Sequence, residues 1–282
     1  MKEALKKLLL DAGACDAGIC RARIYSEQAA VLQSANADFC EADIQKRINP
    51  FLIMPDAKSV IVYAVSYKSS LCGNISSYAY GKDYHRVLPE IARPAAEMLL
   101  SQNYSAAVFS DTGELPDRYL AYLSGLGFFG KNHCLIHPKY GSFIFIGYIL
   151  TNCPLPHDTP LASACAGCGE CVRACPSGAL QNGDFSLCLS HITQKKGTLS
   201  PAEEALIKSS GTIWGCDICQ NVCPHNLRAP DSAVGNFCDD PITNLSLPED
   251  ISNREFKRLF GDRAFSWRGK NVLLRNQRII NS

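Results

Sequence analysis

Two sets of closely spaced cysteines are the part of the sequence best suited to metal chemistry. The first set is a Cys-x2-Cys-x2-Cys-x3-Cys-Pro run made of Cys165, Cys168, Cys171 and Cys175. The second set reads Cys216-x2-Cys219-x3-Cys223-Pro. It lacks one close cysteine, which Cys188 can supply from upstream, with 27 residues between it and Cys216. Thiolates at this spacing hold [4Fe–4S] clusters in bacterial ferredoxins. The sequence therefore predicts two such clusters.

The division of the ligands between the clusters follows from the ferredoxin pattern, in which the fourth cysteine of a run ligates the other cluster. We expect the first cluster to be held by Cys165, Cys168, Cys171 and Cys223. The second would be held by Cys175, Cys188, Cys216 and Cys219. Structural zinc is the alternative, because zinc also binds Cys-x2-Cys pairs. A zinc site, however, does not require three cysteines at this spacing with a Cys-Pro fourth.

The seven other cysteines have no ligand spacing, and we interpret them as small apolar residues of the core. They are Cys15, Cys20, Cys40, Cys72, Cys134, Cys153 and Cys238. With 15 cysteines, Cys-x2-Cys packing and no evident secretion signal, the chain is expected to work in a reducing cytoplasm. No run of about 18 apolar residues indicates a membrane span. The first residues favour an amphipathic helix over a signal peptide.

The charge is unevenly distributed, although the net charge is only +1. Residues 254–282 carry eight basic side chains against Glu255 and Asp262, so that 8 − 2 gives +6. The segment is open to two interpretations, a solvated helical face or a basic tail that contacts phosphates of a nucleic acid. The basic residues are Arg254, Lys257, Arg258, Arg263, Arg268, Lys270, Arg275 and Arg278.

The chain divides into parts of different character. Residues 1–150 alternate between helical and strand patterns and predict an α/β or α+β domain. The helical patterns cover 2–13, 86–102 and 115–127, and the strand patterns cover 59–67, 105–111 and 142–150. Residues 151–230 are rich in Cys, Gly and Pro and predict a ferredoxin-like domain organised by metal. Residues 231–282 form a polar connection followed by the basic tail. The chain has no GxGxxG after a strand and no Walker-type loop.

Three stretches make the chain resemble the epoxyqueuosine reductase family. They are "YAYGKDYHRVL" (78–88), "DTGELPDRYLAYLSGLGFFGKN" (111–132) and "GCDICQNVCPHN" (215–226), and Ser124 stands where the family usually has Ala. The resemblance covers nearly the whole chain, including "CLSHITQKKG" from Cys188 and "RGKNVLLRNQRII" near the end. Family members commonly continue into helical HEAT-like repeats. In the family these repeats help to hold tRNA. We therefore expect a short form of the family, in which the basic tail or a separate protein binds the tRNA, or in which the substrate is a different one.

The resemblance implies a cobalamin in the N-terminal domain, beside the nearer cluster. It also implies removal of the epoxide oxygen of epoxyqueuosine at the wobble position of tRNA. That reaction takes two protons and two electrons, which an external low-potential donor would supply. Two other hypotheses remain, a related reductase of another substrate and an electron-transfer iron–sulfur protein.

The family motifs also imply roles for single residues. Asp111 takes the place of the general acid, and we expect a raised pKa for it beside the corrin. Arg118 and Asn132 align with cofactor contacts. Lys131, Tyr84 and His85 lie in the same motifs, and we expect them near the cofactor as well.

Overall fold

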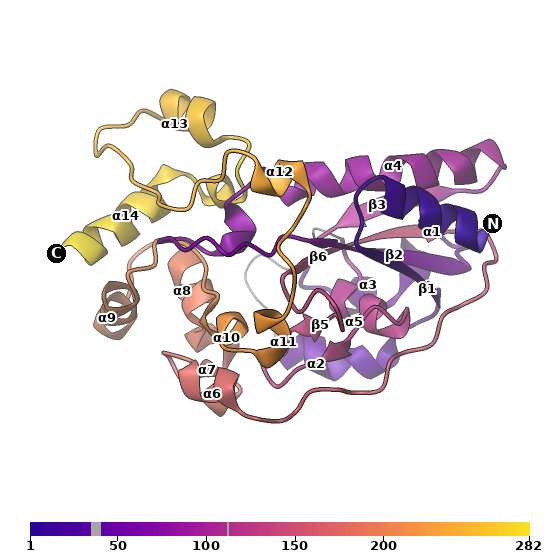
Figure 1. Ribbon diagram of the computed structural model, residues 1–282, viewed down its shortest axis with the longest axis horizontal. Coiled ribbons are helices and arrows are strands. Elements are labelled where there is room, and N and C mark those ends of the chain that lie inside the picture. Colours follow the sequence, from indigo (N-terminus) through magenta and orange to yellow (C-terminus); the bar gives the residue numbers. More distant parts are fainter. Residues whose placement is uncertain (35–40, 112) are drawn as a thin grey trace. The chain divides into compact units, whose positions relative to one another are not determined.

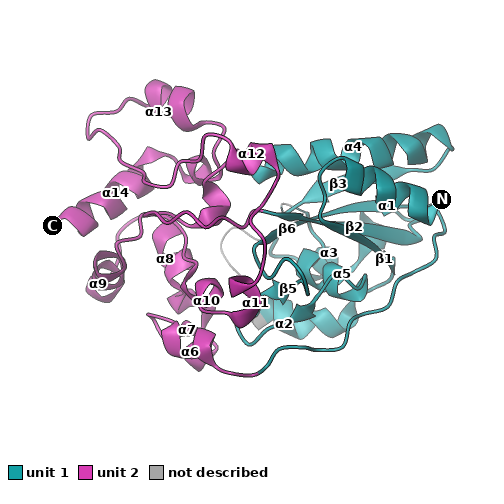
Figure 2. Ribbon diagram, viewed as in Figure 1, with its two compact units in different colours: residues 1–66, 84–166 teal, residues 67–83, 167–282 magenta. Residues whose placement is uncertain are grey.

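The computed structural model describes residues 1–34, 41–111 and 113–282 and forms two compact units. Unit 1 contains residues 1–66 and 84–166, and unit 2 contains residues 67–83 and 167–282 (Figure 2). These bounds differ from the predicted division at 150 and 230. The connection after residue 150 stays with unit 1 because Asp158 accepts from Ile19 N–H (2.9 Å) and pairs with Lys2 and Lys6.

Unit 1 is built on one antiparallel sheet of four strands in the order β1-β2-β6-β3 (Figure 1). The strands are β1 (Asp16–Arg21), β2 (Ser59–Ser66), β3 (Ala106–Ser110) and β6 (Ile144–Thr151). A small hairpin joins β4 (Phe128–Phe129) to β5 (Leu135–Ile136). The antiparallel pairing makes the unit α+β. The strand predictions for 59–67, 105–111 and 142–150 are confirmed, whereas β1 was not predicted.

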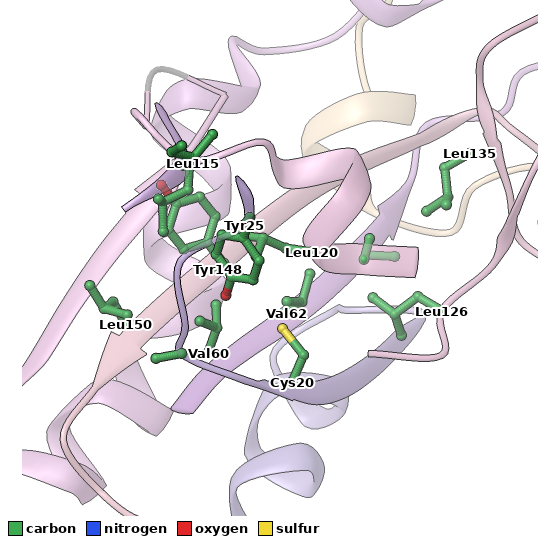
Figure 3. Close-up of a cluster of buried hydrophobic side chains, with 14 of the residues drawn as sticks. Cys20, Tyr25, Val60, Val62, Leu115, Leu120, Leu126, Leu135, Tyr148 and Leu150 are labelled. Atoms are coloured by element: carbon green, nitrogen blue, oxygen red, sulfur yellow. The ribbon is translucent and has the colours of Figure 1, made fainter. Parts of the chain in front are cut away.

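The two central strands are buried on both faces. Along β2, Val60, Val62 and Ala64 face one side, as expected for the two-residue repeat of a strand, and join a cluster with Tyr148 and Leu120 (Figure 3). On the other side Tyr63 donates a hydrogen bond to Leu88 O at 2.8 Å. A Cβ at position 147 would lie 2.3 Å from the Tyr63 ring, so glycine is required there.

Helices cover both faces of this sheet. The helices α1 (Lys2–Asp11) and α4 (Tyr84–Ser101) pack on the Tyr63 side, and α5 (Asp117–Leu123) packs on the opposite side (Figure 1). Two further helices are α2 (Ala29–Ser34) and α3 (Ile44–Ile48). A stripe of apolar residues along α4 is buried, and the helix continues through Pro89 and Pro94. The predicted helices over 2–13, 86–102 and 115–127 are confirmed with shifted ends.

Unit 2 consists of short helices joined by turns, which suits a domain organised by metal. They are α6 (Glu170–Ala174), α7 (Ala179–Asn182), α8 (Leu189–Gln194), α9 (Pro201–Ser210), α10 (Ile218–Asn221), α11 (Pro224–Leu227), α12 (Gly235–Cys238), α13 (Asn253–Phe260) and α14 (Lys270–Asn281). A small apolar cluster in this unit contains Leu189, Ile192, Leu199 and Ile207, and Ile279 and Ile280 of α14 pack against it. The end of the chain is therefore part of the folded unit.

Candidate functional site

Asp111 lies directly after β3, in a backbone conformation that few residues adopt. Its φ is +57°, in the left-handed region where aspartate and asparagine are among the tolerated residues. The side chain is 55% exposed. The turn therefore presents the carboxylate at the end of the sheet.

Two aromatic side chains at the start of α4 hold this carboxylate. The phenol of Tyr84 donates a hydrogen bond to Asp111 Oδ2, and His85 Nε2 lies 3.4 Å from the same oxygen. The Tyr84 ring is stacked on His85 and on Phe145 of β6, with centroids 4.1 and 4.3 Å apart. The structure thus brings together three of the residues that the family motifs singled out.

These contacts change the acidity of Asp111. The surrounding residues desolvate this half-exposed carboxyl in part, which raises its pKa, but the hydrogen bonds from His85 and Tyr84 and the charges of His85 and Arg118 lower the pKa by more. The net direction is downward, so the raised pKa expected from the sequence is not what the protein residues alone produce. Asp111 is an ionised carboxylate in this arrangement, and it must gain a proton before it can donate one.

A second carboxyl group, Asp117, was missed by the sequence reasoning. Desolvation and the nearby charge of Asp111 raise the pKa of Asp117 to about 7, while Arg118 and Arg47 act in the opposite direction. Asp117 is the first residue of α5, which packs on the sheet, and this explains its poor solvation. Asp117, unlike Asp111, is therefore partly protonated near neutral pH. The sequence could have pointed to Asp117, because it lies six residues after Asp111 and next to Arg118.

The remaining predicted cofactor residues lie around the turn that joins β4 to β5. Arg118 donates to His133 O at 3.0 Å, next to Asn132 and the exposed Lys131. Asn132 is only 6% exposed, and its Oδ1 accepts from Cys134 N–H at 3.3 Å. A Cβ at Gly130 would lie 2.6 Å from that oxygen, so the turn needs glycine.

The hydrogen bonding of Asn132 indicates whether these residues fit a cobalamin. Its Nδ2 is buried without a hydrogen-bond partner among the described residues. A buried donor without a partner is costly, and a polar group of a bound molecule would satisfy it. The residues present therefore fit the expected cofactor. Asn132 and Arg118 would supply polar contacts to it.

The cysteines of unit 2 interact electrostatically in two groups. Desolvation raises the pKa of Cys171, and the charges of Cys168 and Cys223 add to the increase. Desolvation likewise raises the pKa of Cys216 to about 11, and Cys188, Asp217 and Cys175 add to it. The three cysteines of each group belong to one of the two ligand sets expected from the spacing, and the sets themselves stay a prediction. Cys165 lies three residues before Cys168 in the chain, and Cys219 lies in α10.

The described residues of the chain contain no group of three His, Cys, Asp or Glu side chains that converge on a single metal ion. The assignment of cluster ligands therefore rests on the spacing of the runs and on these interactions. Bound thiolates must be deprotonated, so a cluster would reverse the raised pKa values.

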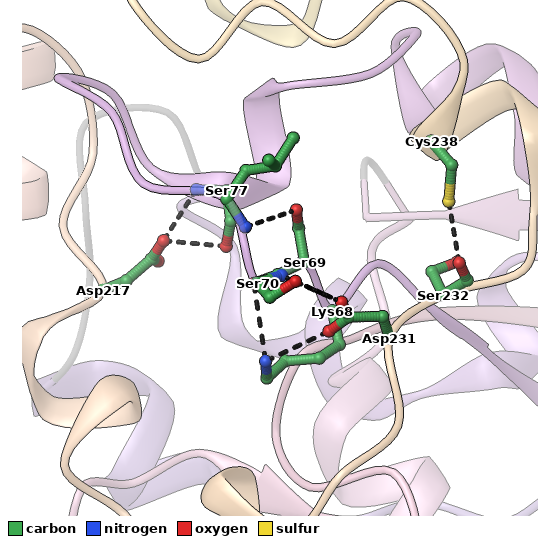
Figure 4. Close-up of polar contacts among 9 residues, drawn as sticks. Lys68, Ser69, Ser70, Ser77, Asp217, Asp231, Ser232 and Cys238 are labelled. Carbon is green, nitrogen blue, oxygen red and sulfur yellow. Dashed lines mark hydrogen bonds and ion pairs between the residues drawn. The ribbon is translucent and has the colours of Figure 1, made fainter.

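The interpretation of the other cysteines as core residues is partly wrong. Cys20 and Cys153 are buried, and Cys15 and Cys134 are partly exposed. Cys72 and Cys238, however, are exposed. Cys238 donates to Ser232 O, in a region where Asp231 also binds Lys68 and Ser70 (Figure 4). Cys40 lies outside the described residues.

Residues 254–282 are not a solvated tail. Arg263 is 7% exposed and donates to Tyr80 O at 2.9 Å, Lys270 donates to Ile251 O, and Arg278 binds Glu249. Arg275 donates to Lys195 O and Gly197 O, both at 2.8 Å. Four of the eight basic side chains thus bind other residues of unit 2. Arg254, Lys257 and Arg258 of α13 are exposed and available to an anionic partner.

None of the helices in the described ranges combines the length and apolar composition needed to cross a membrane.

Comparison with known proteins matches two families to the chain. A family described as a 4Fe-4S double cluster binding domain matches residues 164–226, and one described as epoxyqueuosine reductase QueG, DUF1730, matches residues 47–112. An epoxyqueuosine reductase from Bacillus cereus is 38% identical and aligns with 90% of this chain and 70% of its own length.

Two solved structures are similar over 99% of this chain and 80% of theirs. One is an epoxyqueuosine reductase crystallised with a tRNA-Tyr epoxyqueuosine-modified tRNA stem loop (33% identity, TM-score 0.92). The other is the epoxyqueuosine reductase of Bacillus subtilis with an aspartate catalytic loop swung out of the active site (32% identity, TM-score 0.85). On the strength of this likeness and of the double-cluster match, the chain belongs to the epoxyqueuosine reductase family.

Proposed function

We propose that this chain reduces epoxyqueuosine to queuosine in tRNA, with Asp111 as the residue that supplies a proton to the departing oxygen. The chain is an oxidoreductase of the epoxyqueuosine reductase family, whose cofactors are cobalamin and two [4Fe–4S] clusters. The bound cofactors supply two electrons to the epoxide. Both carbon–oxygen bonds break, a carbon–carbon double bond forms, and the oxygen leaves as water with two protons.

The observation that carries this proposal is the group formed by Asp111, Tyr84 and His85. Two groups that hold or transfer protons, the Tyr84 phenol and the His85 imidazole, meet at one oxygen of the Asp111 carboxylate, which lies at the end of a sheet on a turn with left-handed backbone. The aspartate named on the catalytic loop of the Bacillus subtilis relative supports the same role for Asp111.

The cysteines are assigned to their clusters on the ferredoxin pattern. Cys165, Cys168, Cys171 and Cys223 would hold the first cluster, and Cys175, Cys188, Cys216 and Cys219 the second. Asn132 and Arg118 would hold the cobalamin, with Lys131 beside them.

For the partners, the relative crystallised with a tRNA stem loop supports tRNA as the substrate. The exposed Arg254, Lys257 and Arg258 of α13 are the surface that we propose for phosphate contacts. An external low-potential donor would supply the electrons. We place the reaction in the cytoplasm, because the thiolate ligands need a reducing compartment.

The test is anaerobic turnover of epoxyqueuosine-containing tRNA by the reconstituted protein with a low-potential reductant. Nucleosides from the digested tRNA are then analysed by mass spectrometry. We expect epoxyqueuosine to be replaced by queuosine, with the mass lowered by one oxygen. A protein that holds cobalamin and both clusters but leaves epoxyqueuosine unchanged would contradict the proposal. It would favour a related reductase of another substrate.

A further inference from the structure

A buried amide in the C-terminal helix α14 is bound to two segments of unit 2 that carry cysteines. Asn276 is 0% exposed, and its Nδ2 donates to Thr193 O at 2.7 Å and to Ile213 O at 2.8 Å. Its Oδ1 accepts from Arg275 Nε at 3.0 Å. Both N–H groups and the oxygen of the amide are thus used, as expected for a polar side chain at complete burial.

The two carbonyl groups that Asn276 binds belong to the segments that carry two expected ligands of the same cluster, Cys188 and Cys216. Thr193 belongs to α8, which begins directly after Cys188, and Ile213 lies three residues before Cys216. A third hydrogen bond joins these segments directly, because Gly215 N–H donates to Thr193 Oγ1 at 2.9 Å. The helix after one cysteine and the loop before the other are therefore fastened together.

The loop that carries Cys216 is also fixed on its other side by residues 74–78. Its Trp214, which is fully buried, donates through Nε1 to Tyr78 Oη at 2.6 Å. Asp217 accepts from Ser77 through both the backbone N–H (2.6 Å) and the hydroxyl (2.8 Å), as Figure 4 shows. Residues 74–78 thus anchor the loop that carries Cys216. The hydrogen bonds of Asn276 and Thr193 then fix the position of α8, and of Cys188 before it, relative to that loop.

We propose that Asn276 is a positioning residue for the second cluster: it sets the spacing between Cys188 and Cys216 and so controls assembly of that cluster. The proposal rests on the ligand assignment given under the proposed function. A cubane needs four thiolates at fixed separations, and the other three expected ligands lie in or beside the Cys216 segment or the first run. Cys188 is the distant ligand, so it depends most on a tie made by the fold.

The sharpest test removes the two N–H donors of Asn276 and keeps its shape. Asn276→Asp retains the acceptor for Arg275 but turns a carboxylate oxygen toward two carbonyl oxygens. The control is Gln277→Glu, one residue further along α14. Among the described residues, Gln277 accepts from Leu247 N–H (2.8 Å) and donates to Leu247 O (2.9 Å), so this variant makes the same amide-to-acid change on a segment that carries none of the expected ligands.

The measurements are iron and sulfide content after anaerobic reconstitution, together with the electron paramagnetic resonance spectrum of the reduced protein. We expect the iron content to decrease from about eight atoms per chain in the parent to about four in Asn276→Asp. The spectrum of Asn276→Asp should match that of Cys188→Ala, measured in parallel. Gln277→Glu should keep about eight. Full iron content in Asn276→Asp, or an equal loss in Gln277→Glu, would overturn the proposal. If Cys188→Ala itself keeps both clusters, the ligand assignment fails, and the proposal fails with it.

A milder pair of variants covers the case in which Asn276→Asp does not fold. Thr193→Val removes the acceptor for Gly215 N–H, and Thr193→Ser keeps it. We expect Thr193→Val to lose iron from one cluster to a chelator at least tenfold faster than the parent, and Thr193→Ser to resemble the parent. Equal rates for the two variants would contradict the proposal. Neither readout requires tRNA, so the result is independent of whether epoxyqueuosine is the substrate.

Discussion

Tyr84 and Asp111, which are 27 residues apart in the sequence, share a hydrogen bond at the oxygen that His85 also approaches. The bond ties the first turn of α4 to the turn after β3. Because Phe145 of β6 stacks on Tyr84, the phenol is held in place by the sheet. The geometry of the carboxylate is thus set by the protein fold, and its acidity is set by the same two neighbours.

Replacing the proposed proton donor should affect turnover and leave the cofactors in place. We expect Asp111→Asn to reduce the rate of epoxide reduction by roughly 10²–10⁴, the usual contribution of a positioned general acid. Asparagine tolerates the left-handed backbone at this position, so the fold should be kept. The measurements are single-turnover kinetics, cobalamin content and iron content. Near-normal turnover in a fully loaded Asp111→Asn protein would mean that Asp111 only shapes its turn.

The second prediction concerns the pH dependence of turnover and the phenol of Tyr84. Tyr84→Phe keeps the stacked ring but removes a hydrogen bond that lowers the pKa of Asp111, so the pKa should rise. A general acid works in its protonated form, and turnover therefore falls as the pH rises through its pKa. We expect this falling limb to move to higher pH in Tyr84→Phe. If the falling limb of the pH profile is at the same pH in Tyr84→Phe and the parent, the Tyr84 phenol does not influence the proton transfer.

The third prediction concerns stability and Asp117. The folded protein raises the pKa of Asp117 to about 7, so this residue favours folding at low pH, and the benefit is lost as the pH rises toward 7. Asp117→Asn removes this dependence. Between pH 5 and pH 8 the variant should gain about 2 kcal/mol in free energy of unfolding relative to the parent.

Chemical denaturation at the two pH values measures this difference. Glu3→Gln is the control, because Glu3 is also an acidic residue in the first turn of a helix but is exposed. It should show no such gain. An equal pH dependence in Asp117→Asn and the parent would show that the carboxyl is solvated.

The fourth prediction concerns tRNA binding by α13. Changing Arg254, Lys257 and Arg258 to Gln should weaken binding and reduce the slope of log affinity against log salt by about 0.9 for each duplex phosphate that the variant no longer neutralises. Lys196→Gln and Lys208→Gln, which remove exposed charges elsewhere in unit 2, are the control and should leave the slope unchanged. Equal slopes in the two sets of variants would exclude α13 as the phosphate-binding surface.

The sequence was most informative where chemistry restricts the residue types. The cysteine runs predicted a domain that binds two clusters, and the double-cluster family match over residues 164–226 supports it. The division of the cysteines between the two clusters stays a prediction, although Cys171 and Cys216 each interact with partners from one expected set. The apolar stretch 142–150 predicted a strand buried on both faces, because such a strand needs apolar side chains throughout, and β6 is that strand. The motif residues Tyr84, His85 and Asp111 meet in space although only the resemblance connected them.

What the sequence did not reveal depends on contacts between distant segments. The strand β1 was missed because "DAGICR" is short and contains glycine, and it is stabilised by pairing with β2. The sequence also did not show which basic side chains of residues 254–282 are buried. Arg263 and Arg275 bind backbone carbonyl oxygens of distant residues, and those contacts are visible only in the fold. Asp117 owes its pKa to desolvation in the fold and to the charge of Asp111, and neither can be read from a local pattern.

Residues 67–83 leave the polypeptide of unit 1 between β2 and α4 and belong to unit 2, which has a consequence for synthesis of the protein. Ser77 binds Asp217, 140 residues later, and Tyr80 O accepts from Arg263 further on. At about 5–20 residues per second, the segment waits roughly 7–30 s on the ribosome before Asp217 is even made. The cluster-binding unit therefore cannot be transferred to another protein as one continuous piece of chain. A graft must carry residues 67–83 together with the cysteine segment from Cys165 onward and the rest of unit 2 up to residue 282.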